Sequence, residues 1–242
     1  ERAWRSAYAE AVTWADRDIA AVMSALERRG RLDRTVLVLV ADHGESLWEH
    51  GEMIHGISFY EGVVRVPLLV SIPGVSGPDQ HGALVSHVDL MPTILESVGA
   101  MPPAGIDGSS LLPVLRGEVG SVRATTLVEG GVEYRGDTHL PGAVISPPWT
   151  LLRQNTGCGR GGGKLPGAYD ELSDCLFDLG EDPGQTTDVS AANAETASQL
   201  MARWEAFRRA HDAQARQLNL SEALIEELQR NGYDFRTEAK PN

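Results

Sequence analysis

Apolar residues recur at every third or fourth position along residues 4–28, a spacing that predicts a long amphipathic helix. Its predicted apolar face consists of Trp4, Tyr8, Ala11, Val12, Ala15, Ile19, Val22, Met23 and Leu26. Arg28, Arg29 and Gly30 follow as a basic last turn and a stop signal. Cations favour the C-terminus of a helix, and glycine readily adopts the left-handed backbone that ends one.

Two unbroken apolar runs come next, at residues 35–41 and 66–72. Continuous rather than alternating apolarity indicates strands that are covered on both faces, as in the centre of a parallel sheet. Residues 89–98 predict a helix that Asp89 caps and Gly99 ends. Helix, strand, loop, strand and helix in this order are typical of an α/β protein.

The pattern changes after about residue 120, where Gly and Pro become frequent and long apolar runs cease. Short apolar segments at 143–145 and 149–153 predict a hairpin across a Pro-Pro pair, joined by a third strand at 175–177. Helices are predicted at 194–217 and 221–230. The sequence therefore predicts a small α+β subdomain with short antiparallel strands and two helices.

Length and composition agree with this organisation. The chain has 242 residues, 42% hydrophobic and 23% charged, which are ordinary proportions for a globular protein. We predict an α/β core at residues 1–125 and the α+β subdomain at residues 126–242. Cys158 and Cys175 allow a single pairing and do not define the redox compartment.

Net charge excludes some classes of partner. The chain carries 21 Lys and Arg against 34 Asp and Glu, for a net charge of −13. A nucleic-acid backbone needs basic residues to displace its counterions, so we expect no nucleic-acid binding. Any anionic substrate then depends on a metal or on a few well-placed basic groups. No run of about 18 apolar residues occurs, so we expect no membrane segment.

Candidate metal ligands follow the first predicted strand, in the motif Asp42-His43-Gly44-Glu45. Ligands collect at the carboxyl ends of strands in an open parallel sheet, and Gly44 allows the chain to turn sharply there. Asp42 and His43 can therefore serve as two ligands of one cation. The alternative is an Asp-His pair that only satisfies the hydrogen bonds of a turn.

Two further histidines, His50 and His55, lie in the same connection. Three of the seven histidines of the chain thus fall between positions 43 and 55, more than a plain connecting loop needs. A second pair, His87 and Asp89, has a simpler interpretation, in which Asp89 caps a helix and His87 packs or bonds locally.

These motifs, in this order, resemble the sulfatase family of the alkaline-phosphatase-like superfamily over most of residues 5–190. The resemblance rests on the helix that contains Tyr8 and Asp16, on Asp42 to Glu45, Glu49 to Gly51, Tyr60-Glu61 and Arg65 to Leu68, and downstream on Val85 to Thr93, Gly105 to Pro113, Leu176 to Leu179 and Asp182-Pro183. It implies a mixed or parallel sheet flanked by helices, and a sulfuric ester hydrolase that acts on small-molecule or glycan sulfate esters. Alternatives within the superfamily are a phosphodiesterase, a phosphonate monoester hydrolase and a phosphoglycerol transferase. An alternative of another class is a non-catalytic metal- or anion-binding module.

The resemblance also implies parts that this sequence does not contain. Sulfatases use a formylglycine nucleophile, made from the Cys or Ser of a Cys/Ser-x-Pro-x-Arg motif, and this motif is absent here. We therefore expect the chain to be a C-terminal fragment that is inactive alone, with the N-terminal half of the same protein as its partner. That half would supply the nucleophile and two more metal-binding acids.

By the same resemblance, Asp42 and His43 complete a site for one divalent metal. Family members most often carry calcium there and place Asn where this chain has His43, and an imidazole favours manganese, zinc or iron. His55 takes the position where many members have a Lys that contacts the sulfate. A protonated imidazole could contact the anion or donate a proton to the leaving oxygen. His50 is a second catalytic candidate, although a structural role is favoured for it.

Overall fold

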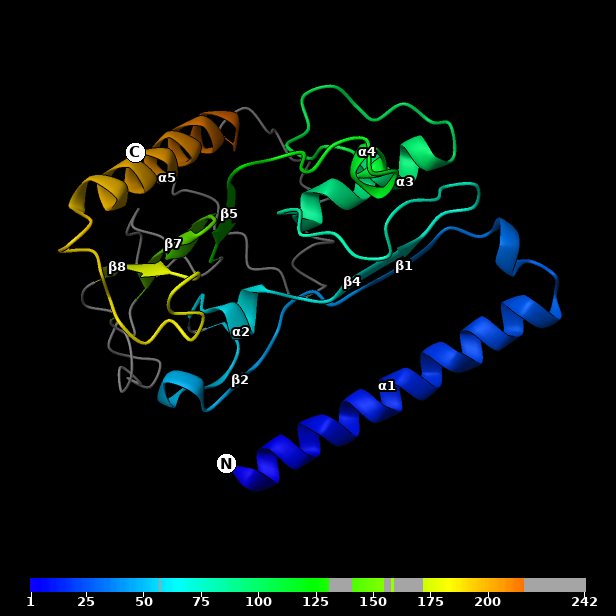
Figure 1. Ribbon diagram of the computed structural model, residues 1–242, viewed down its shortest axis with the longest axis horizontal. Helices are drawn as coiled ribbons and strands as arrows, with labels where there is room; N and C mark the ends of the chain where they lie inside the picture. The colour runs from blue at the N-terminus through cyan, green and yellow to red at the C-terminus, as the bar shows by residue number, and fades with distance from the viewer. Residues whose placement is uncertain (57, 131–140, 155–157, 159–171, 216–242) are drawn as a thin grey trace, which may run out of the picture. The chain divides into compact units, whose positions relative to one another are not determined.

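The computed structural model describes residues 1–56, 58–130, 141–154, 158 and 172–215 (Figure 1). Its contacts divide the chain into two compact units, Glu1–Met201 and Ala202–Asn242. All strands and all helices that end before residue 201 lie in the first unit. The division between residues 125 and 126 stays a prediction. Among the residues that the structure describes, no helix has the length and apolar character that a membrane crossing requires.

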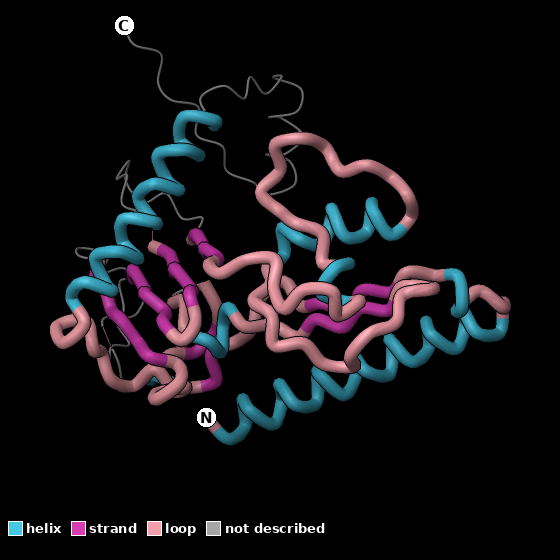
Figure 2. The backbone as a smooth tube through the Cα atoms, turned by 45° about the horizontal axis from the view of Figure 1, so that its top comes forward, coloured by secondary structure: helices cyan, strands magenta, loops and turns pink. Residues whose placement is uncertain are grey.

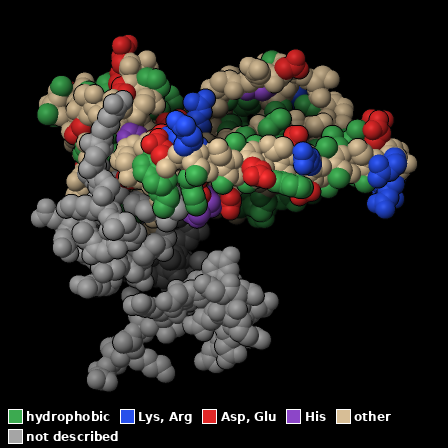
Figure 3. Space-filling model, turned by 90° about the horizontal axis from the view of Figure 1, so that it is seen from below, with side chains coloured by type: hydrophobic (Ala, Val, Ile, Leu, Met, Phe, Trp, Pro, Cys, Tyr) green, Lys and Arg blue, Asp and Glu red, His purple; other side chains and the backbone are tan. Residues whose placement is uncertain are grey.

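The predicted N-terminal helix is confirmed as α1, Arg2–Arg28. Gly30 ends it with a φ of 59°, and its N–H donates to the carbonyl of Glu27. No residue of α1 is buried, and much of its predicted apolar face is exposed: Val12 and Val22 are 54% and 60% exposed, whereas Ile19, Met23 and Leu26 are partly covered. Figure 3, viewed from below, shows green hydrophobic side chains lying open on the surface between charged ones. A short 3₁₀ turn, Leu32–Arg34, leads to the first strand.

The two predicted apolar strands are β1, Leu37–Val40, and β4, Leu68–Ser71. They pair antiparallel with each other, with Leu37 opposite Ser71 and Val40 opposite Leu68, so the prediction of a parallel arrangement is wrong for this pair. The described residues of the connection between them, 41–56 and 58–67, contain no helix longer than one turn, whereas a parallel crossover usually runs through a helix. Leu39 and Leu69 are 40% and 58% exposed, so these strands are not covered on both faces.

The connection from β1 to β4 contains several short elements. Strands β2, Ser46–Leu47, and β3, Met53–Ile54, pair antiparallel, and the 3₁₀ turn Glu49–Gly51 lies between them. Helix α2, Glu61–Val64, then leads into β4. Its backbone holds the start of the connection, because the N–H groups of Gly44 and Glu45 donate to the carbonyls of Val63 and Gly62.

The predicted helix at 89–98 consists of a 3₁₀ turn, His87–Asp89, followed by α3, Leu90–Ser97. It ends at Gly99, which has a φ of 77°. The carboxylate of Asp89 does not cap α3 but accepts the N–H of Ser86, in a capping box with that residue. Helix α4, Leu112–Leu115, completes this part of the fold.

The C-terminal strands form a four-stranded antiparallel sheet in the order β5-β6-β7-β8 (Figure 2). Their bounds are Thr126–Glu129, Gly142–Ser146, Trp149–Gln154 and Ser173–Asp178. The predicted hairpin and its third strand are confirmed, and a cis Pro147-Pro148 peptide lies in the hairpin turn. Tyr60 packs with Leu152, Cys175 and Phe177 in the buried cluster of this sheet, which anchors the β1–β4 connection against it.

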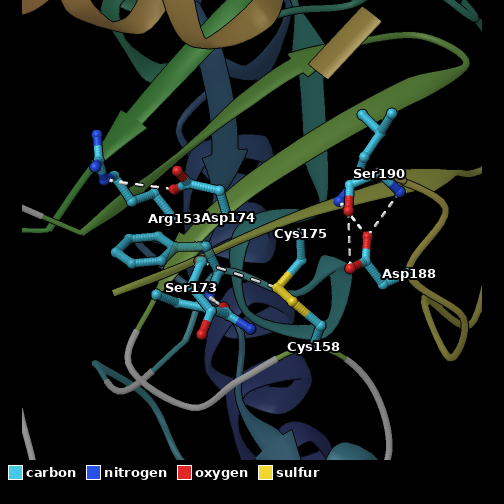
Figure 4. The surroundings of a disulfide bond; sticks show 10 residues. Arg153, Cys158, Ser173, Asp174, Cys175, Asp188 and Ser190 are labelled. Carbon is cyan, nitrogen blue, oxygen red and sulfur yellow. Dashed lines mark hydrogen bonds and ion pairs between the residues drawn. A yellow bond between two sulfur atoms is a disulfide. The ribbon is translucent and has the colours of Figure 1, made fainter. Parts of the chain in front are cut away.

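Helix α5, Ala194–Ala215, confirms the predicted helix at 194–217 up to residue 215. Its last two predicted residues and the helix predicted at 221–230 lie outside the described residues. Cys158 and Cys175 form a disulfide (Figure 4). The same view shows Arg153 paired with Asp174 on the neighbouring strands and Asp188 hydrogen-bonded to Ser190. The disulfide joins Cys158, four residues after the end of β7, to Cys175 on β8 across a sequence separation of 17.

Candidate metal centre

Asp42 and His43 present their side chains together just beyond the end of β1. The Oδ2 atom of Asp42 lies 3.7 Å from Nε2 of His43. Nδ1 of His43 lies 2.9 Å from the carbonyl oxygen of Gly44. A carbonyl only accepts hydrogen bonds, so Nδ1 carries the proton and the lone pair of neutral His43 is on Nε2, the nitrogen nearer the carboxylate. Nitrogen and oxygen donors thus face the same space.

The turn at Gly44 determines this arrangement. A Cβ atom at position 44 would overlap the carbonyl oxygen of Gly62, so only glycine fits there. Oδ1 of Asp42 accepts the N–H of His43 at 3.0 Å. This hydrogen bond, followed by the positive charge that His43 has when it is protonated, lowers the pKa of Asp42 below its ordinary value. The carboxylate is therefore charged at neutral pH, as a metal ligand must be.

His55 joins the same cluster from the other side of the connection. Its ring stacks on that of His43, with centroids 3.8 Å apart and planes inclined by 30°. Nδ1 of His55 lies 3.3 Å from Oε1 of Glu45, whose side chain is only 18% exposed. The carboxylate accepts a hydrogen bond from Nδ1–H of His55 and so orients the ring. Nε2 is then the nitrogen that remains for a ligand or substrate.

His50 occupies a different environment from the other predicted site residues. Its ring stacks on Tyr60 with centroids 3.6 Å apart and planes inclined by 5°. Tyr60 is 2% exposed. The structure therefore brings Asp42, His43 and His55 together and places His50 against the buried cluster. A catalytic role for His50 stays a prediction.

The donor set fits a divalent metal with mixed nitrogen and oxygen ligands. An ionised carboxylate and a neutral imidazole are both ordinary ligands of zinc, manganese or iron, and the carboxylate alone also suits calcium. No group of three or more His, Cys, Asp or Glu side chains that could hold a metal occurs among the described residues. Asp42 and His43 thus offer two ligands from this part of the chain.

Two buried amides that sequence reasoning missed hold the segment after His55. Oε1 of Gln154, on β7, accepts the N–H of Phe59 at 3.2 Å. Oε1 of Gln185 accepts the N–H of Glu61 at 2.7 Å. Both glutamines are at most 1% exposed. No periodic pattern marks a buried polar residue of this kind; Glu45, by contrast, could have been noted as an acid beside two histidines.

The predicted interpretation of His87 is only partly correct. It forms a hydrogen bond, but with Ala41, 46 residues away, rather than locally: Nε2 lies 2.8 Å from that carbonyl oxygen. Glu61 and Arg65, four residues apart, form an ion pair at 3.6 Å. It lies on α2, next to the backbone that holds the Gly44 turn.

Comparison with known proteins gives a consistent family. The family model described as Sulfatase matches residues 2–100. Arylsulfatase K from Xenopus laevis is 30% identical over 192 residues, which cover 77% of this chain and 33% of that protein. A 2-O GAG sulfatase structure matches with a TM-score of 0.66 and 24% identity, covering 86% of this chain and 43% of that one. A phosphonate monoester hydrolase from Silicibacter pomeroyi matches with a TM-score of 0.62 and 26% identity. The match covers 81% of this chain and 38% of that one.

The chain belongs to the sulfatase family, within the alkaline-phosphatase-like superfamily. The predicted α/β class is confirmed by the mixed arrangement of helices and antiparallel sheets and by these structural matches. Proteins of this family are generally metal-dependent. The chain spans about a third of the length of the arylsulfatase K relatives from Xenopus laevis and Bos taurus.

Proposed function

We propose that this chain forms the C-terminal part of a metal-dependent hydrolase that cleaves sulfate esters of small molecules or glycans. The observation that carries the proposal is the cluster of Asp42, His43 and His55 beyond β1, in a chain of the sulfatase family. One carboxylate, one imidazole with a free lone pair and one further imidazole meet there. These are the groups needed to bind a cation and to contact an anionic ester beside it.

Each residue of the cluster has a distinct role in this proposal. Asp42 and His43 bind one divalent metal, which when bound polarises the ester oxygens and supports an ionised nucleophile. His55 contacts the sulfate or donates a proton to the leaving oxygen through Nε2. Glu45 holds the His55 ring in orientation through Nδ1. His50 supports the connection through its stacking on Tyr60.

The nucleophile and the remaining metal ligands come, in this proposal, from the N-terminal half of the same protein. The absence of a Cys/Ser-x-Pro-x-Arg motif from the 242 residues supports this, as does the share of each relative that the chain covers. Exposed apolar side chains on α1, β1 and β4 offer a surface for that half. Trp14, Leu39 and Leu69, for example, are each at least 40% exposed.

The metal of the proposed site is calcium by family resemblance, or manganese, zinc or iron because of the imidazole. Calcium prefers oxygen ligands almost exclusively, whereas the other three accept nitrogen readily. A substitution at His43 therefore tests which metal the site prefers. If the imidazole sets the preference, His43→Asn should raise the affinity for calcium relative to that for manganese. Calorimetric titration of both metals would measure this change.

A second candidate reaction within the same superfamily is phosphonate ester hydrolysis. It is favoured by the match to the Silicibacter pomeroyi phosphonate monoester hydrolase, which is as extensive over this chain as those to several sulfatases. Sulfate monoesters and phosphonate monoesters both present one negative charge, so one cation and one imidazole can serve either substrate. Turnover of the two ester classes by the same preparation distinguishes them.

The test uses the full-length protein with 4-nitrophenyl sulfate and 4-nitrophenyl phenylphosphonate as substrates. We expect faster turnover of the sulfate ester, loss of metal binding and turnover in Asp42→Asn, and a fall of about 10²–10⁴ in turnover in His55→Ala, the usual range for a lost acid–base group. His81→Ala is a matched control, because His81 is exposed and outside the cluster. Turnover and metal affinity unaffected by Asp42→Asn would contradict the proposal.

A further inference from the structure

The candidate metal ligands lie on a turn that is held from both sides. On the side of α2, the N–H groups of Gly44 and Glu45 donate to the carbonyls of Val63 and Gly62, at 2.7 and 3.1 Å. On the other side, the carbonyl of Ala41 accepts a hydrogen bond from His87 at 2.8 Å. Ala41 directly precedes Asp42, so this contact controls the backbone from which the first ligand projects.

The chemistry of the His87 contact is defined by its acceptor. A carbonyl oxygen carries no proton, so Nε2 of His87 must be protonated and must donate. His87 is exposed, and His87 and Ala41 are 46 residues apart. The side chain is therefore not packed in the core. Replacing it should not disturb core packing, so an effect on metal binding would not follow from a loss of packing.

The position of His87 is fixed by a fully buried carboxylate two residues further on. Asp89 is 0% exposed. Its oxygens accept the N–H groups of Ser86 and Ser109, each at 2.9 Å, and both Nε and Nη2 of Arg123. Every oxygen of this carboxylate is therefore paired, which makes the 3₁₀ turn of His87 a firm base.

The loop at Ser109 packs closely against the same turn. A Cβ atom at Gly108 would overlap the carbonyl oxygen of Val88, so the two backbones are in direct contact. The turn that carries His87 is thus held by charge, by hydrogen bonds and by backbone packing. Through its hydrogen bond to Ala41, this firmly held turn also restrains the backbone at the end of β1.

We propose that His87 is a positioning residue for the Asp42–His43 pair and acts by donating a hydrogen bond from Nε2 to the carbonyl of Ala41. The inference rests on the proposed metal site and adds a residue that touches neither metal nor substrate. It gives His87, a member of a second histidine-acid pair that could be mistaken for metal ligands, a role through its contact with Ala41. His87 contributes to metal affinity by restricting the orientation of Asp42, so that less ordering is needed on binding.

The test compares two amides at position 87 in the full-length protein. The side-chain nitrogen of Gln can replace Nε2 of histidine, whereas the shorter Asn cannot reach the carbonyl. After chelator treatment, Ca²⁺, Mn²⁺, Zn²⁺ and Fe²⁺ are titrated separately by calorimetry into wild type, His87→Gln, His87→Asn and Asp42→Asn, with Fe²⁺ kept under anaerobic conditions. His81→Asn is the control, because it makes the same change at another exposed histidine.

We expect His87→Asn to weaken metal binding about tenfold, as replacing outer partners of metal ligands commonly does, and His87→Gln to stay within about twofold of wild type. Melting temperatures of the two amide variants should be equal, which separates positioning from folding. Equal affinities of His87→Asn and wild type, or equal losses in both amide variants, would overturn the role of His87. If wild type binds none of these metals, the proposed metal site falls and the inference falls with it. If only Asp42→Asn loses binding, the site stands and the inference alone is wrong.

Discussion

The backbone N–H of Glu61 donates a hydrogen bond to Oε1 of Gln185, 124 residues further along the chain. Gln185 follows the C-terminal sheet, whereas Glu61 begins the helix that supports the Gly44 turn. With Gln154, which accepts the N–H of Phe59, it fixes the backbone that returns from His55. The C-terminal sheet therefore takes part in building the candidate site, although it supplies none of its predicted ligands.

Replacing Gln185 by Ala should lower the free energy of unfolding of the full-length protein. The partly buried N–H of Glu61 would lose its acceptor, at a cost of about 1–3 kcal/mol. Ala and Gln both carry a Cβ, so the left-handed φ of 51° at this position strains them alike. Denaturant unfolding measures the effect, and Gln199→Ala, on the exposed side of α5, should stay within about 0.5 kcal/mol of wild type. Equal stability of the two variants would contradict the anchoring role of Gln185.

Replacing Arg123 by Met should be more destabilising. The side chain of Arg123 is 15% exposed and that of its partner Asp89 is 0% exposed, so the variant leaves a carboxylate buried without its cation. Loss of one partner of a buried ion pair commonly costs about 3–5 kcal/mol. Arg116→Met is the matched control, because the pair of Arg116 with Glu118 is 44% and 55% exposed and should contribute about 0–1 kcal/mol. A loss no larger than that of the control, measured by denaturant unfolding, would show that the two N–H donors alone satisfy Asp89.

The stabilising effect of Asp182 should depend on pH. Burial raises the pKa of this carboxyl, but hydrogen bonds from Thr187 and Thr186 outweigh burial and hold the pKa below its ordinary value. A carboxylate with a lowered pKa stabilises the fold fully above about pH 4, the pKa of an unfolded Asp, and loses this effect as the pH falls through the lower folded-state value.

Asp182→Ala should therefore be less stable than wild type at pH 7, by about 1–3 kcal/mol for the unmade hydrogen bonds. The difference should shrink as the pH falls below about 4. Unfolding measured across this range checks the trend, and Asp79→Ala, at an exposed Asp, should show no such convergence. If the difference in unfolding free energy between wild type and Asp182→Ala does not change with pH, ionisation of Asp182 does not contribute to stability.

Removing the disulfide should lower stability through the unfolded chain. Cys158 and Cys175 close a loop with a sequence separation of 17, and such a cross-link contributes about 3 kcal/mol in the chain-entropy description. The double variant Cys158→Ala and Cys175→Ala should be destabilised by about this amount. A reductant should destabilise wild type to a similar extent and leave the double variant unchanged. If the reductant changes neither protein, the pairing does not contribute to stability.

Local sequence signals predicted the elements of this fold well. Three- and four-residue spacing identified α1, and glycines with positive φ mark its end and that of α3. The hairpin of β6 and β7 followed from short apolar segments on either side of a Pro-Pro pair. What failed was the direction of the β1–β4 pairing. An unbroken apolar run indicates that a strand is apolar on both faces, but it does not indicate whether the neighbouring strand is parallel or antiparallel.

The candidate site was partly predictable for a related reason. Asp42 and His43 directly follow a strand, so the end of the strand brings them together. The stacking of His55 on His43 depends on how the connection folds back, which adjacent residues do not determine. Gln185 and His87 act through contacts with residues 124 and 46 positions away. A single buried amide or exposed imidazole produces no periodic sequence pattern from which such a contact could be predicted.

The antiparallel pairing of β1 with β4 means that the connection bearing Asp42, His43 and His55 leaves and rejoins the sheet at neighbouring points. Its ends are fixed by Val40 opposite Leu68, whatever lies between them. One exchange of this continuous segment between related genes would therefore transfer the proposed metal ligands and the proposed anion contact together, without changing the strand register. Under the proposed roles, the selectivity of this half of the site would be inherited as a single module, whereas that of a site assembled from scattered residues must change one position at a time.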